Sequence, residues 1–191
     1  MTLSDFCRAR PFGGYQMIMA DPPWAFDLRS DLGEEKSAQA QYDCMSIDDI
    51  KSLPVGMLAG SDSLLWLWAT HPMLPEALDV MRAWGFTYKT SGVWSKRNPE
   101  SGKLAFGTGY LLRCASEPFL IGTIGSPKTT RSTRTVIEGA RREHSRKPEE
   151  AYAAAESLMP GIRRADLFTR QSRPGWDAWG NEATKFDEEA A

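Results

Sequence analysis

Short apolar runs that alternate with helical patterns constrain the fold of this chain most. The runs are bounded by glycine, proline or polar residues, as is typical of buried strands. They predict strands at 16–20, 63–70, 87–95, 118–123, 135–140, 165–169 and 176–179. Apolar residues at helical spacing, with a capping serine or a proline near the start, predict helices at 46–53, 71–85 and 147–161. This order predicts an α/β fold: a mostly parallel sheet with helices on both faces.

Length and composition narrow the class of protein. The 191 residues fit one domain over 1–191, with a short N-terminal segment at 1–14 and a polar, solvated tail at 183–191. The net charge of −2 provides no overall positive field that could hold nucleic acid by charge alone. Three cysteines without a CxxC pair indicate reduced thiols and a cytoplasmic location. No apolar run is long enough to span a membrane, and the two histidines lack partners at metal-binding spacing, so we expect neither membrane nor metal.

The first predicted strand ends in an unusual group, Asp21-Pro22-Pro23-Trp24. Neither proline has an N–H group, so the strand cannot continue, and their carbonyl groups are expected to remain free acceptors. A carboxylate and fixed carbonyls beside an indole ring suit a planar ligand with an amino group, such as adenine. An isolated Asp-Pro-Pro is also a common strand-ending turn, so both interpretations stay open.

Two long connections are too polar to be purely structural. Residues 25–41 are mostly charged or polar, which predicts a mobile loop or lid. Residues 128–147 contain seven cations and two acids, which favours contact with phosphates beside the site over a plain charged loop. The cations are Lys128, Arg131, Arg134, Arg141, Arg142, Arg146 and Lys147.

Several motifs together resemble one known family over residues 15–182. They are "MIMADPPW", "QYDCMSIDDIKSLP", "LLWLWAT" with "LDVMRAWGF", "GYLLRCASEPFLIGTIG", "HSRKPEEAY", "ADLFTR" and "WGNE". This set is similar to the DPPW-type adenine methyltransferases related to the eukaryotic messenger-RNA adenine methyltransferase, the MT-A70-like family. The resemblance implies a permuted, Rossmann-like methyltransferase that uses S-adenosylmethionine. A permuted order also explains why no GxGxxG motif follows the first strand.

The resemblance also implies roles for individual residues. The catalytic residues would be Asp21, Pro22, Pro23 and Trp24. The cofactor would be bound by Met19 and Ala20 through their backbone, and by Asp21, Lys147, Arg170, Asn181 and Glu182. The substrate would be bound by Trp24, Tyr42, Trp68, Glu117, Arg141 and Arg142, with Trp24 or Tyr42 stacking on the base. Ser172 and Arg173 replace a His-Asn pair of the family, and Glu182 replaces a glutamine.

The expected reaction is transfer of a methyl group to the N6 amino group of adenine in nucleic acid. DNA is favoured over RNA, because the core is compact and lacks the extensions of RNA-directed relatives. The alternatives are an RNA adenine methyltransferase and a catalytically silent, nucleic-acid-binding subunit of a heterodimer. A homo- or heterodimer is compatible with either activity. A methyltransferase for protein or small-molecule amines is disfavoured by the basic segment.

Overall fold

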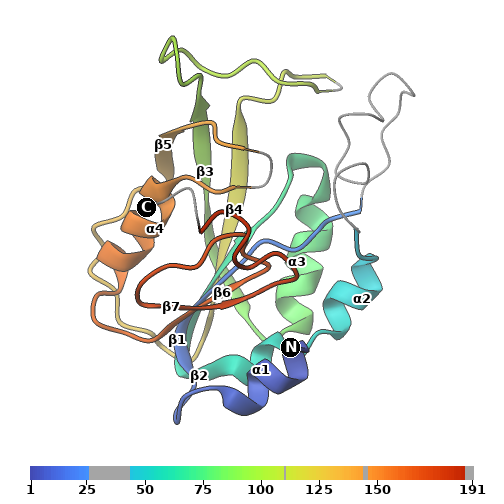
Figure 1. The fold of residues 1–191 in the computed structure, drawn as a ribbon, viewed down its shortest axis with the longest axis vertical. Coiled ribbons are helices and arrows are strands. Elements are labelled where there is room, and N and C mark those ends of the chain that lie inside the picture. Colours follow the sequence, from blue (N-terminus) through green and yellow to red (C-terminus); the bar gives the residue numbers. More distant parts are fainter. Residues whose placement is uncertain (26–43, 110, 144–145, 188–191) are drawn as a thin grey trace.

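A seven-stranded sheet forms the centre of the computed structural model, which describes residues 1–25, 44–109, 111–143 and 146–187 (Figure 1). The strand order across the sheet is β5-β3-β4-β2-β1-β6-β7. The strands are β1 (Tyr15–Ala20), β2 (Ala59–Trp68), β3 (Thr87–Arg97), β4 (Ser116–Ile124), β5 (Val136–Ala140), β6 (Arg164–Leu167) and β7 (Trp176–Trp179).

All the strands except β4 run in one direction. β1 pairs in parallel with β2 and β6, β6 with β7, and β3 with β5, whereas β4 lies antiparallel between β2 and β3. The sheet is therefore mostly parallel, as the sequence predicts. The carboxyl ends of β1, β2, β3, β5, β6 and β7 consequently meet at one edge, together with the first residues of β4.

Helices cover both faces of this sheet, as predicted. They are α1 (Leu3–Ala9), α2 (Ile47–Ser52), α3 (Leu74–Ala83) and α4 (Glu149–Leu158), with short 3-10 turns at Val55–Leu58 and His71–Met73. The expected cap of α2 is present, because the Ser46 side chain accepts a hydrogen bond from the backbone N–H of Asp49 at 3.1 Å. The predicted helix boundaries shift by a few residues, because helix ends depend on local capping.

Alternate residues of the central strands supply two separate cores. In β1, Ile18 and Ala20 point into a cluster formed with α1, α2 and α3, whereas Met17 and Met19 point into a cluster with α4. The second cluster is rich in aromatic rings, and Trp66 stacks on Phe119 with a centroid separation of 4.2 Å. Burial on both faces explains why the central strands read as continuous apolar runs.

Two terminal segments differ from the expectations. The N-terminal segment forms helix α1, which starts with a capping box between Thr2 and Asp5. The predicted solvated tail instead folds back: the backbone N–H of Phe186 donates to the Arg170 carbonyl at 3.1 Å, and Asp187 accepts from Ser172. Within the four described ranges, no helix is long and apolar enough to cross a membrane.

Candidate active site

The carboxyl edge of the sheet brings together charged residues that lie far apart in the sequence. Asp21 directly follows β1, and Lys147 precedes α4. The Lys147 ammonium group lies 2.7 Å from the Asp21 carboxylate and 2.6 Å from that of Glu117, the second residue of β4. The same ammonium lies 5.3 Å from the ring centre of Trp68, at the end of β2. Four predicted site residues therefore form one cluster.

Burial makes the electrostatics of this cluster strong. Burial raises the pKa of Asp21, and the nearby Lys147 opposes the rise without cancelling it. Glu117 is also mostly buried, but Lys147 and Lys96 together outweigh the effect of burial and lower the pKa of Glu117 to about 2. The pKa of Lys147 is raised despite its burial, because two carboxylates surround it. Lys147 and Glu117 are thus held in their charged forms.

The two prolines place their carbonyl groups differently from the expectation. Neither carbonyl is free: that of Pro22 accepts the backbone N–H of Trp24 at 2.8 Å, and that of Pro23 accepts Met45 at 3.0 Å. These bonds arise because the chain turns tightly after β1 and pairs with the segment before α2. A carbonyl oxygen has two lone pairs, so each can accept one further hydrogen bond.

Trp24 packs inside the protein instead of offering a stacking surface. Its ring is 4% exposed in the core beneath α1–α3, and its indole N–H donates to the Trp68 carbonyl at 3.1 Å. The expectation that Trp24 stacks on a base is therefore wrong for this structure, because its ring faces are already covered. The alternative stacking residue, Tyr42, lies outside the described residues.

A pocket lies beside this cluster, between the end of β1, the loop after β6 and the start of α4. Its lining carries two carboxylates and four cations among neutral polar and aromatic groups. It is lined by Asp21, Trp68, Arg146, Lys147, Tyr152, Asp166, Phe168, Thr169, Arg170, Gln171 and Arg173. Two donors of these lining residues, the indole N–H of Trp68 and the Nε–H of Arg173, are buried without a hydrogen-bond partner. The pocket therefore has donors available as well as acceptors.

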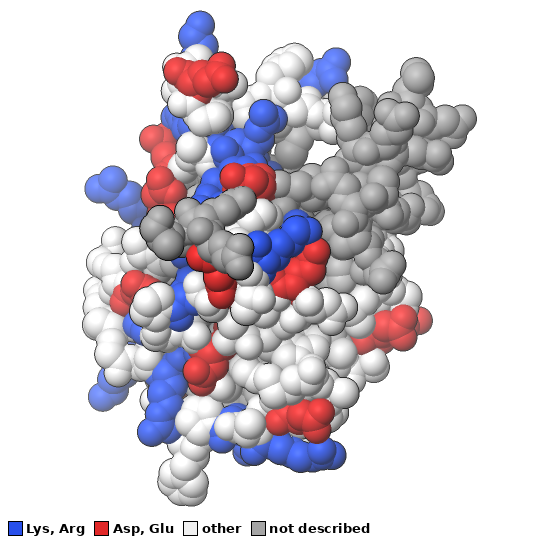
Figure 2. Space-filling model, viewed as in Figure 1, with Lys and Arg blue, Asp and Glu red and all other residues white. Residues whose placement is uncertain are grey.

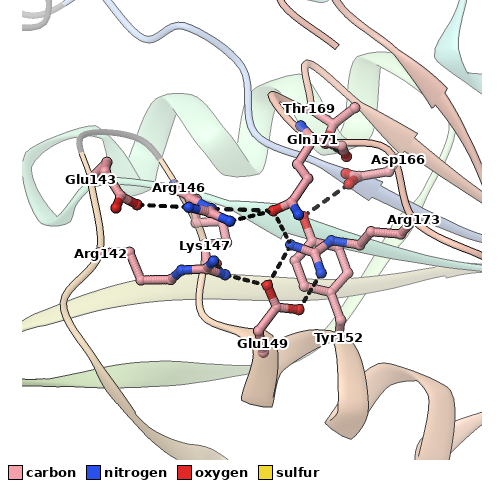
Figure 3. Close-up of polar contacts among 10 residues, drawn as sticks. All are labelled: Arg142, Glu143, Arg146, Lys147, Glu149, Tyr152, Asp166, Thr169, Gln171 and Arg173. Atoms are coloured by element: carbon pink, nitrogen blue, oxygen red, sulfur yellow. Dashed lines mark hydrogen bonds and ion pairs between the residues drawn. The ribbon is translucent and has the colours of Figure 1, made fainter. Parts of the chain in front are cut away.

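A polar network fixes the wall of this pocket (Figure 3). The Gln171 side-chain carbonyl accepts from Arg146 at 2.9 Å and from Arg173 at 3.3 Å. Glu149, the first residue of α4, pairs with Arg173 and Arg142. The Arg173 guanidinium lies 3.7 Å from the ring centre of Tyr152. Arg173 thus ties the loop after β6 to α4, so the residue that departs from the family pattern has a structural role here.

Asp166 is a second buried carboxyl group in the pocket. It lies in β6 next to Met19 of β1, and the Tyr152 hydroxyl donates to it at 2.9 Å. Burial raises the pKa of Asp166 to about 7, against the hydrogen bonds from Thr169 and Tyr152 and the charge of Arg173. This group is therefore partly protonated near neutral pH.

The other predicted cofactor residues lie at the same edge but in different environments. Met19 and Ala20 are buried, and their strand pairs with neighbours on both sides, so their backbone belongs to the sheet. Arg170 lines the pocket and pairs with Glu182 at 2.5 Å. Asn181 follows β7 and is exposed, and neither it nor Glu182 is part of the pocket lining.

The predicted basic segment does not form one patch. Arg146 and Lys147 are buried in the pocket, and Arg142 is paired with Glu149. The stretch containing Lys128, Arg131 and Arg134 instead runs along α4, where Thr130 and Thr133 hydrogen-bond to backbone carbonyls of that helix. Acidic and basic atoms are interspersed over the face in Figure 2. Of the two arginines expected to bind substrate, Arg141 alone is exposed at the carboxyl edge.

Several residues of the site were missed from the sequence, among them Lys96, Asp166 and Phe186. Lys96 pairs with Glu117 at 2.6 Å, Asp166 lines the pocket, and Phe186 lies against Arg146 and Arg170 with centroid distances of 5.0 and 5.4 Å. A signal existed for Asp166, because a carboxyl group inside a predicted buried strand requires a partner. Lys96 at a strand end and Phe186 in a polar tail gave no such signal.

No cluster suited to a metal ion occurs among the residues that the structure describes.

Comparisons with known proteins identify the family of this chain. The MT-A70 family model matches residues 15–182. A putative N(6)-adenosine-methyltransferase MT-A70-like protein of Medicago truncatula is 34% identical over 174 residues, which are 89% of this chain and 26% of that protein. The human N(6)-adenosine-methyltransferase catalytic subunit METTL3 is 30% identical over 89% of this chain and 28% of its own length.

A shorter relative is similar over most of its length. The type II methyltransferase M.MunI of a Mycoplasma species is 29% identical over 88% of this chain and 77% of its own length. By contrast, the chain spans only about a quarter of the plant and human relatives. Because the family model covers nearly all of the sheet and its carboxyl edge, this chain belongs to the MT-A70 family.

Proposed function

We propose that this protein transfers a methyl group from S-adenosylmethionine to the N6 amino group of adenine in nucleic acid. The observation that carries the proposal is the contact of Lys147 with Asp21, at the carboxyl edge of the sheet and beside the pocket. Ligands of open α/β sheets bind at this edge. Relatives named N(6)-adenosine-methyltransferases support the N6 amino group of adenine as the group that receives the methyl group.

The pocket residues fit the chemical groups of S-adenosylmethionine. Its ammonium and sulfonium groups are positively charged and suit the carboxylates of Asp21 and Asp166, and its carboxylate suits cations such as Arg146. Thr169, Gln171 and the buried indole N–H of Trp68 offer hydrogen bonds to hydroxyl and ring nitrogen atoms. When bound, this cofactor supplies a methyl group on a positively charged sulfur, an electrophile that needs no metal.

Asp21 is placed to orient the adenine amine. Its carboxylate can accept one N–H of the amine, and the second lone pair of the Pro22 carbonyl can accept the other. Fixed acceptors keep the nitrogen pointing toward the electrophile, and alignment of this kind can lower a barrier by about 7 to 11 kcal/mol. The nitrogen gains a carbon and must release one proton. A carboxylate with a raised pKa, such as Asp21, is a suitable transient acceptor.

The substrate is DNA in this proposal. The chain matches the type II methyltransferase over most of that protein's length, whereas it matches only about a quarter of the N(6)-adenosine-methyltransferases. The target adenine must be unpaired or turned out of a duplex, because its amino group is otherwise hydrogen-bonded to the opposite base. Arg141, exposed at the same edge, is suited to a phosphate contact. In this proposal the protein acts on DNA in the cytoplasm.

Labelled methyl transfer to matched DNA and RNA oligonucleotides tests this proposal. We expect label in DNA, in single strands more than in duplex, and a rate at least a hundredfold lower for Asp21→Asn, because loss of a positioned proton acceptor costs about that much. Asp62→Asn is the matched control, since Asp62 bonds the turn after β4, away from the site. Labelling of RNA alone would reassign the substrate, and binding of oligonucleotides without any labelling would indicate a silent subunit.

A further inference from the structure

Four charged side chains form a row of alternating sign from β3 to β1. Lys96 lies 2.6 Å from Glu117, Glu117 lies 2.6 Å from Lys147, and Lys147 lies 2.7 Å from Asp21. Their side chains are 23%, 14%, 7% and 20% exposed in that order, so water screens them weakly. The row begins at a residue outside the cofactor pocket and ends at the carboxylate that is proposed to hold the amine.

The sheet fixes Lys96 at its place in this row. Trp94 of β3 pairs with Glu117 of β4, and Lys96 lies two residues further along β3 on the same face as Trp94. The backbone N–H of Lys96 donates to the Ala115 carbonyl at 2.9 Å. Its ammonium group lies 4.8 Å from the ring centre of Trp94, which adds a cation–π contact. Backbone and side chain are therefore both held, unlike those of an ordinary surface lysine.

The charge balance shows what Lys96 does. The Lys147 ammonium is shared between two carboxylates, those of Asp21 and Glu117. Without Lys96, Glu117 would have Lys147 as its one paired cation among the residues that the structure describes and would attract it more strongly, away from Asp21. Lys96 supplies Glu117 with a second cation, and the pKa of Glu117, about 2, reflects both lysines. Lys147 is then left to hold Asp21. The charged groups that act on Asp21 are Lys147, Glu117 of β4, Lys96 of β3 and Asp166 of β6.

We propose that Lys96 is a positioning residue for methyl transfer, which neutralises Glu117 so that Lys147 holds the Asp21 carboxylate in place. This inference rests on the proposed function. It differs from a phosphate-binding role, because the Lys96 ammonium is directed at Glu117. A phosphate contact would change the affinity for nucleic acid and its salt dependence, whereas a positioning role changes the turnover and its dependence on pH.

The test uses Lys96→Met and Lys96→Arg, with Lys89→Met as the matched control on the same strand. Lys89 is exposed on β3 before the strand reaches the site. For Lys96→Met we expect the acidic limb of the single-turnover rate to move to higher pH by about one unit, equivalent to about tenfold at pH values below the limb. The direction follows because loss of the Lys96 charge, and a weaker hold by Lys147, both disfavour ionised Asp21. Cofactor affinity is expected to change less than twofold, and Lys96→Arg is expected to restore the profile.

A second background separates positioning from simple folding defects. In Glu117→Gln there is no carboxylate for Lys96 to neutralise, so adding Lys96→Met is expected to shift the acidic limb by much less than in the wild-type background, leaving only the direct effect of the Lys96 charge on Asp21. An unchanged limb in the single variant, or an equal shift in both backgrounds, would overturn the proposal. A loss confined to nucleic-acid affinity, reversed by low salt, would also overturn it and indicate a phosphate contact.

A readout that needs no substrate distinguishes this proposal from the proposed function. NMR titration of the carboxyl carbon of Glu117 in the protein alone is expected to show a higher pKa in Lys96→Met than in wild type, and no change in Lys89→Met. An unchanged pKa would overturn the inference even in an active enzyme. If wild type labels no nucleic acid while the pKa moves as expected, the charge row is supported and the proposed reaction is wrong.

Discussion

Asp166 couples the cofactor pocket to the stability of the fold through a single proton. Burial raises its pKa from an ordinary value of 3.8 to about 7. Between these values the folded protein holds the proton more tightly than the unfolded chain does. The free energy of unfolding therefore falls as pH rises from about 4 to 7, and this contribution stays constant above that window.

Asp166→Asn removes this dependence while keeping an acceptor for the Tyr152 hydroxyl. A pKa change of this size corresponds to roughly 4 kcal/mol. Between pH 4 and 7 we therefore expect the free energy of unfolding to fall by several kcal/mol more in wild type than in the variant. Urea titrations at both pH values measure this. Asp187→Asn is the control, because the pKa of the half-buried Asp187 is lowered, so that this group titrates below the window. Equal pH slopes for wild type and Asp166→Asn would contradict the account.

The residues of the site were only partly predictable from the sequence. Asp21 was identified by its place after an apolar run, and Lys147 and Glu117 by the family resemblance, but the three meet only because β1, β4 and the start of α4 share one edge. The burial of Trp24 depends on Trp68, which is distant in sequence, and the pairing of Arg142 with Glu149 depends on how the chain turns into α4. Local patterns carry no information about such contacts.

The C-terminal segment is an element that holds the pocket wall from outside. Glu182 pairs with Arg170, and the Phe186 ring lies against the guanidinium groups of Arg146 and Arg170. Both arginines line the pocket. The segment therefore restricts the two cations, although it contributes no residue to the lining itself.

Phe186→Ala is expected to weaken binding of S-adenosylmethionine by about fivefold, because each cation–π contact at a partly exposed site is worth about 0.5 to 1 kcal/mol. Isothermal titration calorimetry measures the dissociation constant. Phe106→Ala is the matched control, since Phe106 is 78% exposed in the connection between β3 and β4 and is not part of the pocket lining. Equal weakening in both variants would show that the segment does not restrain the pocket.

Elements were predicted better than their directions and ends. The seven strands and three of the four described α-helices match the predicted pattern, because burial on two faces and helix caps leave local signals. The antiparallel course of β4 left none, because an apolar run reads the same in either direction. Helix α1 was missed because it spans only seven residues, too few for a clear apolar period.

The whole molecule concentrates chemistry at one edge of a mostly parallel sheet. Strand direction brings the residues after β1, β3, β5 and β6 to that edge, and the antiparallel β4 adds Glu117, its second residue. A partly buried row of alternating charges and a polar pocket then lie side by side. The central claim is that this edge methylates the exocyclic amine of adenine, with Asp21 as the group that orients it.

The position of the transferred methyl group tests that claim most directly. Oligonucleotides treated with the protein and isotope-labelled S-adenosylmethionine are digested to nucleosides and analysed by mass spectrometry. The account predicts labelled N6-methyladenine with wild type, and almost none with Asp21→Asn at equal cofactor occupancy. Label on a ring nitrogen of adenine, label on another base, or undiminished N6-methyladenine with Asp21→Asn would contradict it.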